Sequence, residues 1–242
     1  MKLINKQILW LLPILILCSA SYAQPDSFIS IKQKTEVLTN KNKLTTEIDL
    51  FFDKNKQTLT KYYHSSPDFV MITNSLGEIK TYYPGKNEVD YKQISELSSK
   101  RSLIYYFANN LTDHLGLADE GFNLESSNFE DQYYITNWRP PSYLNNRLTN
   151  VKMVFENGMP VYSEYQQNNE EVLKKIYYTN YKDFVQFRLP EKIIEISYNP
   201  AGDSIISRTV FSDVNVSPVA DNSYFNFKIP ENAKPVSTEK NK

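Results

Sequence analysis

Four short runs of alternating apolar and polar residues follow one another between Thr58 and Tyr91. Side chains of a β-strand point to opposite faces in turn, so this alternation predicts four strands that each have one apolar face. Pro67, Gly77 and Gly85 lie in the short connections, where the backbone must turn. Strands with such short connections are antiparallel neighbours in one sheet, and another part of the chain has to cover the apolar face.

More strands are predicted on both sides of this stretch. Asn157-Gly158 between two alternating runs is a strong hairpin signal. Residues 27–38 can form a first strand or a short helix, and we favour the strand. Other runs with a strand pattern cover residues 45–53, 133–137, 151–156, 159–166, 174–181, 187–198, 204–216 and 224–230. We expect a mainly β chain in which about ten or eleven of all these runs are the strands of one strongly curved antiparallel sheet, an incomplete barrel.

A helical period replaces the strand pattern after residue 99. The apolar positions Leu103, Ile104, Phe107, Leu111 and Leu115 recur at steps of three and four residues. This spacing predicts a helix over residues 100–115, and the glycine that follows it is suited to a left-handed cap. A helix with one apolar stripe lies across a sheet. The stripe can serve plain core packing, or it can form, with the following loop, a lid over a cavity.

The first 23 residues have the layout of a secretory signal peptide. Lys2 and Lys6 precede an apolar run from Ile8 to Leu17. The sequence Ser21-Tyr22-Ala23 then fits a cleavage site between small residues. The apolar run is too short for a membrane-spanning helix, so we expect export to the periplasm of a Gram-negative envelope.

Cys18 is the only cysteine, and it lies inside this segment. A bacterial lipoprotein signal would acylate such a cysteine, but Leu17 is bulky where these signals have a small residue, so we do not expect a lipid anchor. The exported chain would contain no disulfide. We expect a single domain over residues 24–236 and a polar tail over residues 237–242.

Residues that carry enzyme chemistry are scarce. His64 and His114 are the only histidines, and they belong to different predicted elements, so no zinc spacing exists. Six glycines scattered over turns build no phosphate loop and no nucleophile elbow. The formal net charge of −1 without a basic block gives no case for nucleic acid. We therefore expect neither an enzyme nor a cofactor or metal.

Three stretches of the sequence resemble the periplasmic lipoprotein carrier family, the LolA and LolB group. They are Pro67–Val89 with its Tyr-Tyr-Pro-Gly-Lys-Asn hairpin, Leu189–Ile193 ahead of Phe211–Asn215, and Phe225-Asn226-Phe227-Lys228-Ile229-Pro230. The arginine that this family has before the turn proline is Ser66 here. The resemblance implies an incomplete barrel with a helical lid over an apolar cavity, which holds the acyl chains of lipoproteins.

We therefore expect a monomeric carrier of lipoprotein acyl chains or other lipidic cargo, which exchanges it with membrane-bound donor and acceptor proteins. The cavity residues are predicted to be Leu50, Phe52, Phe69, Met71, Ile79, Tyr83, Leu103, Phe107 and Leu111. The alternative is an envelope protein of the same fold that has no cavity and binds another protein. Tyr133, Tyr134, Trp138 and Arg139 would then be its contact surface, because Tyr, Trp and Arg are favoured as interface anchors.

Overall fold

The computed structural model describes residues 28–39, 42–145, 147–167, 171–199 and 203–236. The expected signal peptide with Cys18 and the expected polar tail lie outside the described residues. No helix in the described part of the chain is long and apolar enough to cross a membrane.

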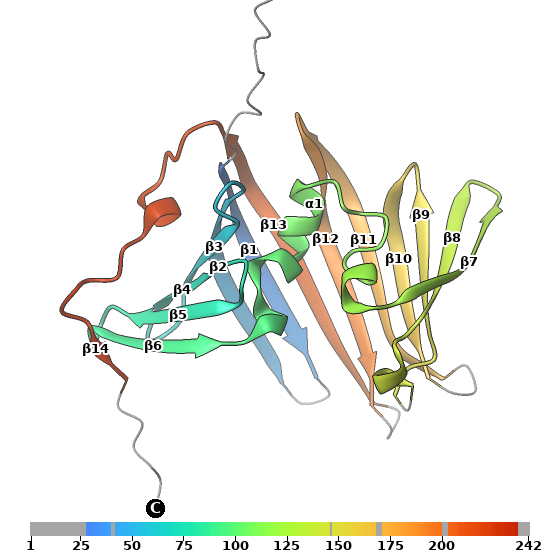
Figure 1. The fold of residues 1–242 in the computed structure, drawn as a ribbon, viewed down its shortest axis with the longest axis horizontal. Coiled ribbons are helices and arrows are strands. Elements are labelled where there is room, and N and C mark those ends of the chain that lie inside the picture. The colour runs from blue at the N-terminus through green and yellow to red at the C-terminus, as the bar shows by residue number, and fades with distance from the viewer. Residues whose placement is uncertain (1–27, 40–41, 146, 168–170, 200–202, 237–242) are drawn as a thin grey trace, which may run out of the picture.

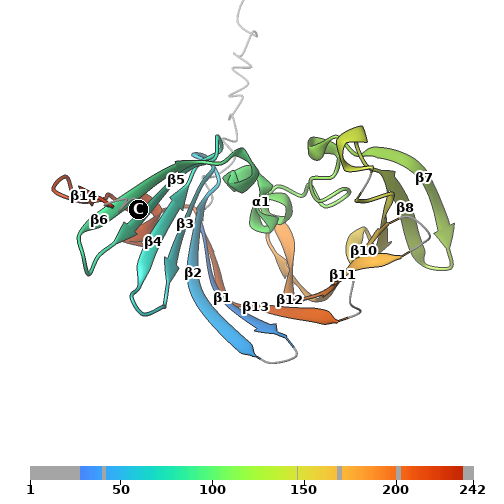
Figure 2. The same cartoon turned by 90° about the horizontal axis from the view of Figure 1, so that it is seen from below.

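The described residues form one sheet of fourteen strands that is not closed into a barrel. Its order is β14-β6-β5-β4-β3-β2-β1-β13-β12-β11-β10-β9-β8-β7, and all neighbours are antiparallel except β14 and β6. The strands are β1 (Phe28–Leu38), β2 (Lys43–Asp53), β3 (Thr58–Tyr63), β4 (Phe69–Thr73), β5 (Glu78–Tyr83), β6 (Glu88–Gln93), β7 (Asn123–Glu130), β8 (Tyr133–Arg139), β9 (Asn150–Glu156), β10 (Met159–Gln166), β11 (Val172–Phe184), β12 (Phe187–Tyr198), β13 (Ser204–Ser217) and β14 (Lys234–Pro235). Figure 2 shows the sheet bent into a trough, with the one α-helix of the described residues on its inner side. The mainly β fold class with one curved antiparallel sheet is confirmed.

The predicted meander is present as β3 to β6, each strand paired with the next. Gly77 turns the chain between β4 and β5 with a φ of +81°. A Cβ at this position would lie 2.4 Å from the carbonyl oxygen of Ile94, so the turn requires glycine. Asn157 and Gly158 both have positive φ between β9 and β10, which is the expected tight hairpin.

The helix is shorter than the periodicity predicted. The α-helix α1 runs only over Leu103–Ala108, and Ser102 caps its first turn by accepting a hydrogen bond from the Tyr105 amide. Asn110 adopts a left-handed φ of +55°. Its amide donates to the Phe107 carbonyl, and the next amide, of Leu111, donates to the Tyr106 carbonyl, which is the hydrogen-bond pattern of a Schellman motif. The prediction of a helix up to residue 115 was therefore wrong, because this asparagine terminates it.

Single 3-10 turns make up the remaining helical structure of the described residues. They are η1 (Ser95–Leu97), η2 (Ser99–Arg101), η3 (Ala118–Glu120), η4 (Ser142–Leu144) and η6 (Ser223–Asn226). The first two lead from β6 into α1, and η3 and η4 lie in the connections before β7 and β9.

The predicted last strand, residues 224–230, was wrong. The segment begins with η6 and crosses the outer face of the sheet, as Figure 1 shows. Phe225 is 4% exposed, and its ring lies edge-on to Phe28 and Phe51 at centroid distances of 5.1 and 5.4 Å. Phe227 packs beside Tyr82. These aromatic rings bury their apolar surface against residues of other strands, so the segment does not have to pair as a strand of the sheet.

The sheet has two hydrophobic cores on its inner side. The first joins α1 to strands β1, β2, β3, β11 and β12 through Phe52, Phe107, Leu189 and their neighbours. The second lies under the turns before β7 and includes Trp138, Met153 and Phe155. Trp138 is only 8% exposed, and its indole N–H donates to Thr136 Oγ1. Its expected place in an exposed contact surface was therefore wrong.

Candidate functional site

The register of the sheet brings the predicted cavity residues of the strands to one face. Leu50 is paired with Lys61, Lys61 with Met71 and Met71 with Thr81 across β2 to β5. Directly opposite residues of antiparallel strands point to the same side, and Leu50 packs in the core beneath α1. This face is therefore the inner face of the trough. The same registers place Phe52, Phe69, Ile79 and Tyr83 on it.

A pocket of about 250 Å³ lies between α1 and the inner face. Strands β1, β2, β3, β12 and β13 form its floor, and the beginning of α1 covers it. Its apolar lining consists of Leu50, Leu59, Leu103, Ile104, Ile193 and Phe211. Its polar lining consists of Gln33, Lys61, Ser102, Glu195, Ser207 and Thr209. We call this space the helix pocket.

Two of the predicted cavity residues, Leu50 and Leu103, line the helix pocket. Leu50 is 4% exposed on the floor, whereas Leu103 is 37% exposed at the first position of α1. A leucine that is half open to solvent at the rim of an apolar pocket can contact a guest without being part of the packed core.

Phe52 and Phe107 hold the helix down instead of lining the helix pocket. Both are fully buried. The Phe107 ring lies 6.4 Å from that of Tyr178 and 6.2 Å from that of Tyr181, and Phe52 meets Tyr105 edge-on at 6.3 Å. These contacts fix α1 on β2 and β11, so the two phenylalanines set the depth of the pocket below the helix.

The other predicted residues lie farther from the helix pocket. Phe69 lies toward the β6 end of the inner face, where its ring is stacked on Tyr63 at a centroid distance of 4.2 Å and tilted against Tyr83 at 5.8 Å. Met71 and Ile79 belong to the same end. Leu111 lies in the turn after α1 and is half-buried.

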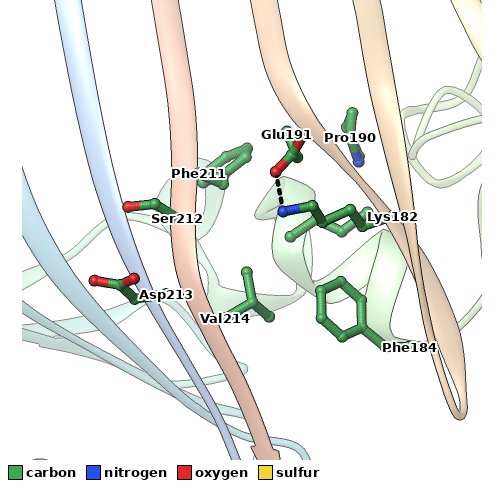
Figure 3. A pocket seen from close by; sticks show the side chains of 9 residues that line it. Lys182, Phe184, Pro190, Glu191, Phe211, Ser212, Asp213 and Val214 are labelled. Carbon is green, nitrogen blue, oxygen red and sulfur yellow. Dashed lines mark ion pairs between the residues drawn. The ribbon is translucent and has the colours of Figure 1, made fainter.

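A second pocket of about 240 Å³ adjoins the first, because Phe211 lines both. It lies where β12 and β13 separate. The two strands are paired from Lys192 and Val210 to Tyr198 and Ser204, whereas the residues before Lys192 in β12 and those after Val210 in β13 are not paired with each other. Figure 3 shows the apolar side chains Phe184, Phe211 and Val214 around it, with an ion pair between Lys182 and Glu191 across its middle. We call it the split pocket.

Lys61 is the charged residue of β3 among the helix-pocket residues that the list of cavity residues missed. It points to the same face as Leu59 and Tyr63, in a strand whose alternation was recognised. Burial lowers the pKa of Lys61 from its ordinary value of 10.5. The signal that could have identified it is its position two residues from both Leu59 and Tyr63, which places the lysine on the apolar face of the strand.

The described residues bring no metal-binding cluster together. Within the described ranges, no group of three or more His, Cys, Asp or Glu side chains could hold a metal ion. His64 Nε2 lies 2.9 Å from Asp49 Oδ2, and the other histidine, His114, accepts a hydrogen bond from the Gly116 amide at Nδ1. The two histidines thus have separate local partners.

Comparison with known proteins identifies the fold. No protein-family model matches the sequence, and no curated protein matches it. Among solved structures, a LolA superfamily protein from Nitrosomonas europaea is similar with a TM-score of 0.53 and 12% identity over 83% of this chain and 90% of the other. A Vibrio parahaemolyticus domain named for outer membrane lipoprotein sorting is similar with a TM-score of 0.52 and 14% identity, over 83% of this chain and 90% of the other. A DUF1329 family protein from Desulfovibrio piger is similar with a TM-score of 0.52 and 12% identity, over 84% of this chain and 90% of the other. The chain has the LolA-like fold, which confirms the resemblance seen in the sequence at the level of the fold.

Proposed function

We propose that this protein is a non-enzymatic carrier that holds an acyl chain in the helix pocket and moves lipidic cargo between membranes. The observation that carries the proposal is the pocket itself, a space of about 250 Å³ that is roofed by α1 and has six apolar side chains in its lining. Alkyl chains are recognised by burial alone, so such a site needs no reactive side chain.

In this proposal the alkyl chain occupies the helix pocket and extends past Phe211, the residue that lines both pockets, toward the split pocket. Each methylene group that enters contributes about 0.8 kcal/mol, so a chain with eight buried methylenes gains roughly 6 kcal/mol before the entropy cost of binding. A net affinity of this size is useful for a carrier, because the cargo can be passed to an acceptor that binds it more tightly.

We infer that α1 is the element that moves during cargo exchange. The helix α1 has six residues and is followed by turns, so it depends on tertiary contacts for its stability. Cargo exchange would displace α1 and the following loop from the inner face. The proposed cargo is the acyl chains of lipoproteins or other lipids, and a monomer in the periplasm would receive and deliver it at membrane-bound proteins. The fold shared with a domain named for lipoprotein sorting supports this setting.

Native mass spectrometry of protein purified without detergent tests the proposal. The protein is incubated with phospholipid vesicles, separated from them, and weighed under native conditions. We expect an added mass that disappears on denaturation. A single apo mass, before and after incubation with vesicles or a lipopeptide, would contradict the proposed function.

A matched pair of variants locates the cargo. Leu103→Glu places a carboxylate at the rim of the helix pocket, and Leu97→Glu places one on η1, where Leu97 is 55% exposed and lines no described pocket. Both positions are exposed enough to tolerate the change. We expect L103E to lose most of the bound mass and L97E to retain it.

A further inference from the structure

Lys61 is a cation on an otherwise apolar part of the inner face. Its cross-strand neighbours are Leu50 and Met71, and the preceding inward residue of its own strand is Leu59. Its side chain lines the helix pocket and is half-buried there. An ammonium group that has lost part of its hydration lowers stability unless a counter-charge is near.

The charges inside the helix pocket do not balance. Glu195 also lines it, but this carboxylate is paired with Lys174 at 3.4 Å and accepts a hydrogen bond from Ser197 at 3.2 Å. No acidic side chain of the described residues forms an ion pair with Lys61. The pocket therefore contains one uncompensated positive charge beside an apolar space.

We propose that Lys61 binds the anionic head group, a carboxylate or a phosphate, of an amphiphile whose alkyl chain occupies the helix pocket. The proposal rests on the proposed function and specifies its cargo class. The chain would lie against Leu50, Leu59 and Ile104, and the head group would remain at the ammonium group. Gln33 and Ser207 line the same pocket and can donate hydrogen bonds to head-group oxygens.

The charge of Lys61 selects among amphiphiles that have the same chain. An uncharged alcohol gains the same burial as a fatty acid, but it leaves the ammonium group without a counter-charge. A cationic amine adds repulsion to that loss. A hydrogen bond between charged groups in a partly desolvated site corresponds to about a tenfold change in affinity. The expected order of affinity is therefore anion, then alcohol, then amine.

Displacement of the neutral fluorophore N-phenyl-1-naphthylamine from the full chain measures this order. Dodecanoate, dodecyl phosphate, dodecanol and dodecylammonium are each titrated below their aggregation concentrations. We expect the anions to bind about tenfold more tightly than dodecanol, and dodecylammonium to bind more weakly than dodecanol. The two anions distinguish a carboxylate from a phosphate head group, and acetate and inorganic phosphate, which lack the chain, should displace nothing.

Three variants assign the preference to the side chain. Lys61→Met removes the charge and keeps the length, Lys61→Arg keeps the charge, and Lys80→Met removes an exposed lysine from the outer face of β5. We expect K61M to bind dodecanoate and dodecanol with equal affinity. K61R and K80M should keep the preference for the anions.

The outcomes separate this inference from the proposed function. Equal affinity of the wild-type protein for all four amphiphiles would overturn the role of Lys61 and leave the pocket as an alkyl site. An anion preference that persists in K61M would place the head group elsewhere and overturn it too. If no amphiphile displaces the fluorophore, both the inference and the carrier function are contradicted. The order measured on the wild-type protein decides the question even if a variant fails to fold.

Discussion

Replacing Phe107 by alanine should separate the residues that hold α1 from those that line the pocket. Phe107 is fully buried, and it touches the rings of Tyr178 and Tyr181. Truncating a buried phenylalanine costs about 3–5 kcal/mol, because burial is lost and a cavity remains. Leu103→Ala removes a side chain that is already 37% exposed, so its cost should be about 1 kcal/mol.

Urea unfolding followed by circular dichroism measures both changes. With a slope of about 2 kcal/mol per molar urea, F107A should lower the midpoint by roughly 2 M and L103A by roughly 0.5 M. The two folded variants should have the opposite order of effect on the affinity for dodecanol. L103A should weaken binding more, because it removes a contact to the alkyl chain, whereas F107A enlarges the space under α1. Equal midpoint shifts for the two variants would refute the assignment of Phe107 as the anchor of the helix.

Three further predictions concern the pocket cation, the outer segment and a turn. Burial lowers the pKa of Lys61, so the unfolded chain binds the Lys61 proton more tightly than the folded chain does. The free energy of unfolding should therefore rise as the pH increases from the lowered pKa toward 10.5. Urea midpoints measured across this range should show a smaller rise in K61M. Phe225→Ala should loosen the outer segment and raise its rate of thermolysin cleavage several-fold, since the ring is docked between two others, whereas Val219→Ala, at a 63% exposed position, should not. Gly77→Ala should lower the free energy of unfolding by more than the ~1 kcal/mol that a left-handed alanine alone costs, because the added Cβ would clash with backbone atoms. Gly158→Ala is the control in the same unfolding assay, because Gly158 also has a positive φ but open space around its Cβ position. Equal costs for the two glycines would contradict the steric argument.

The alternation of apolar residues was sufficient to predict most of the sheet. Residues 58–91 form the expected strands because each run is bounded by a turn residue and has one apolar face. The inward orientation of Leu50, Phe69 and Tyr83 follows from the same alternation, since the side-chain period of a strand is two. This regularity explains why the fold class could be predicted.

The helix end and the last segment could not be predicted from periodicity. Leu111 and Leu115 continue the helical spacing, but the left-handed Asn110 ends the helix, and its side chain donates to the Gln186 carbonyl on the neighbouring connection. That partner is remote in the sequence. Likewise, residues 224–230 alternate like a strand, yet their rings bind the outer face of strands formed by the first part of the chain. Both outcomes depend on tertiary contacts.

The separation of β12 from β13 is a third feature that local patterns do not contain. Each of the two strands keeps its other neighbour along the split: β11 for β12 and β1 for β13. Irregular backbone lies beside the split pocket: the register of β1 with β13 shifts between Ser30 and Lys32, and Asn180 and Asp213 have positive φ. A list of cavity residues derived from strand faces alone therefore omits Leu189, Phe211 and Val214.

Photo-crosslinking with a fatty acid that carries a diazirine near the middle of its chain tests the central claim most directly. The full chain is irradiated with the probe, digested, and the modified residues are identified by peptide mass spectrometry. An alkyl chain under α1 predicts label on Leu50, Leu59 and Ile104, which an excess of dodecanoate removes. Label confined to the outer segment around Phe225, or to the exposed strand β7, would show that the inner face takes up no chain.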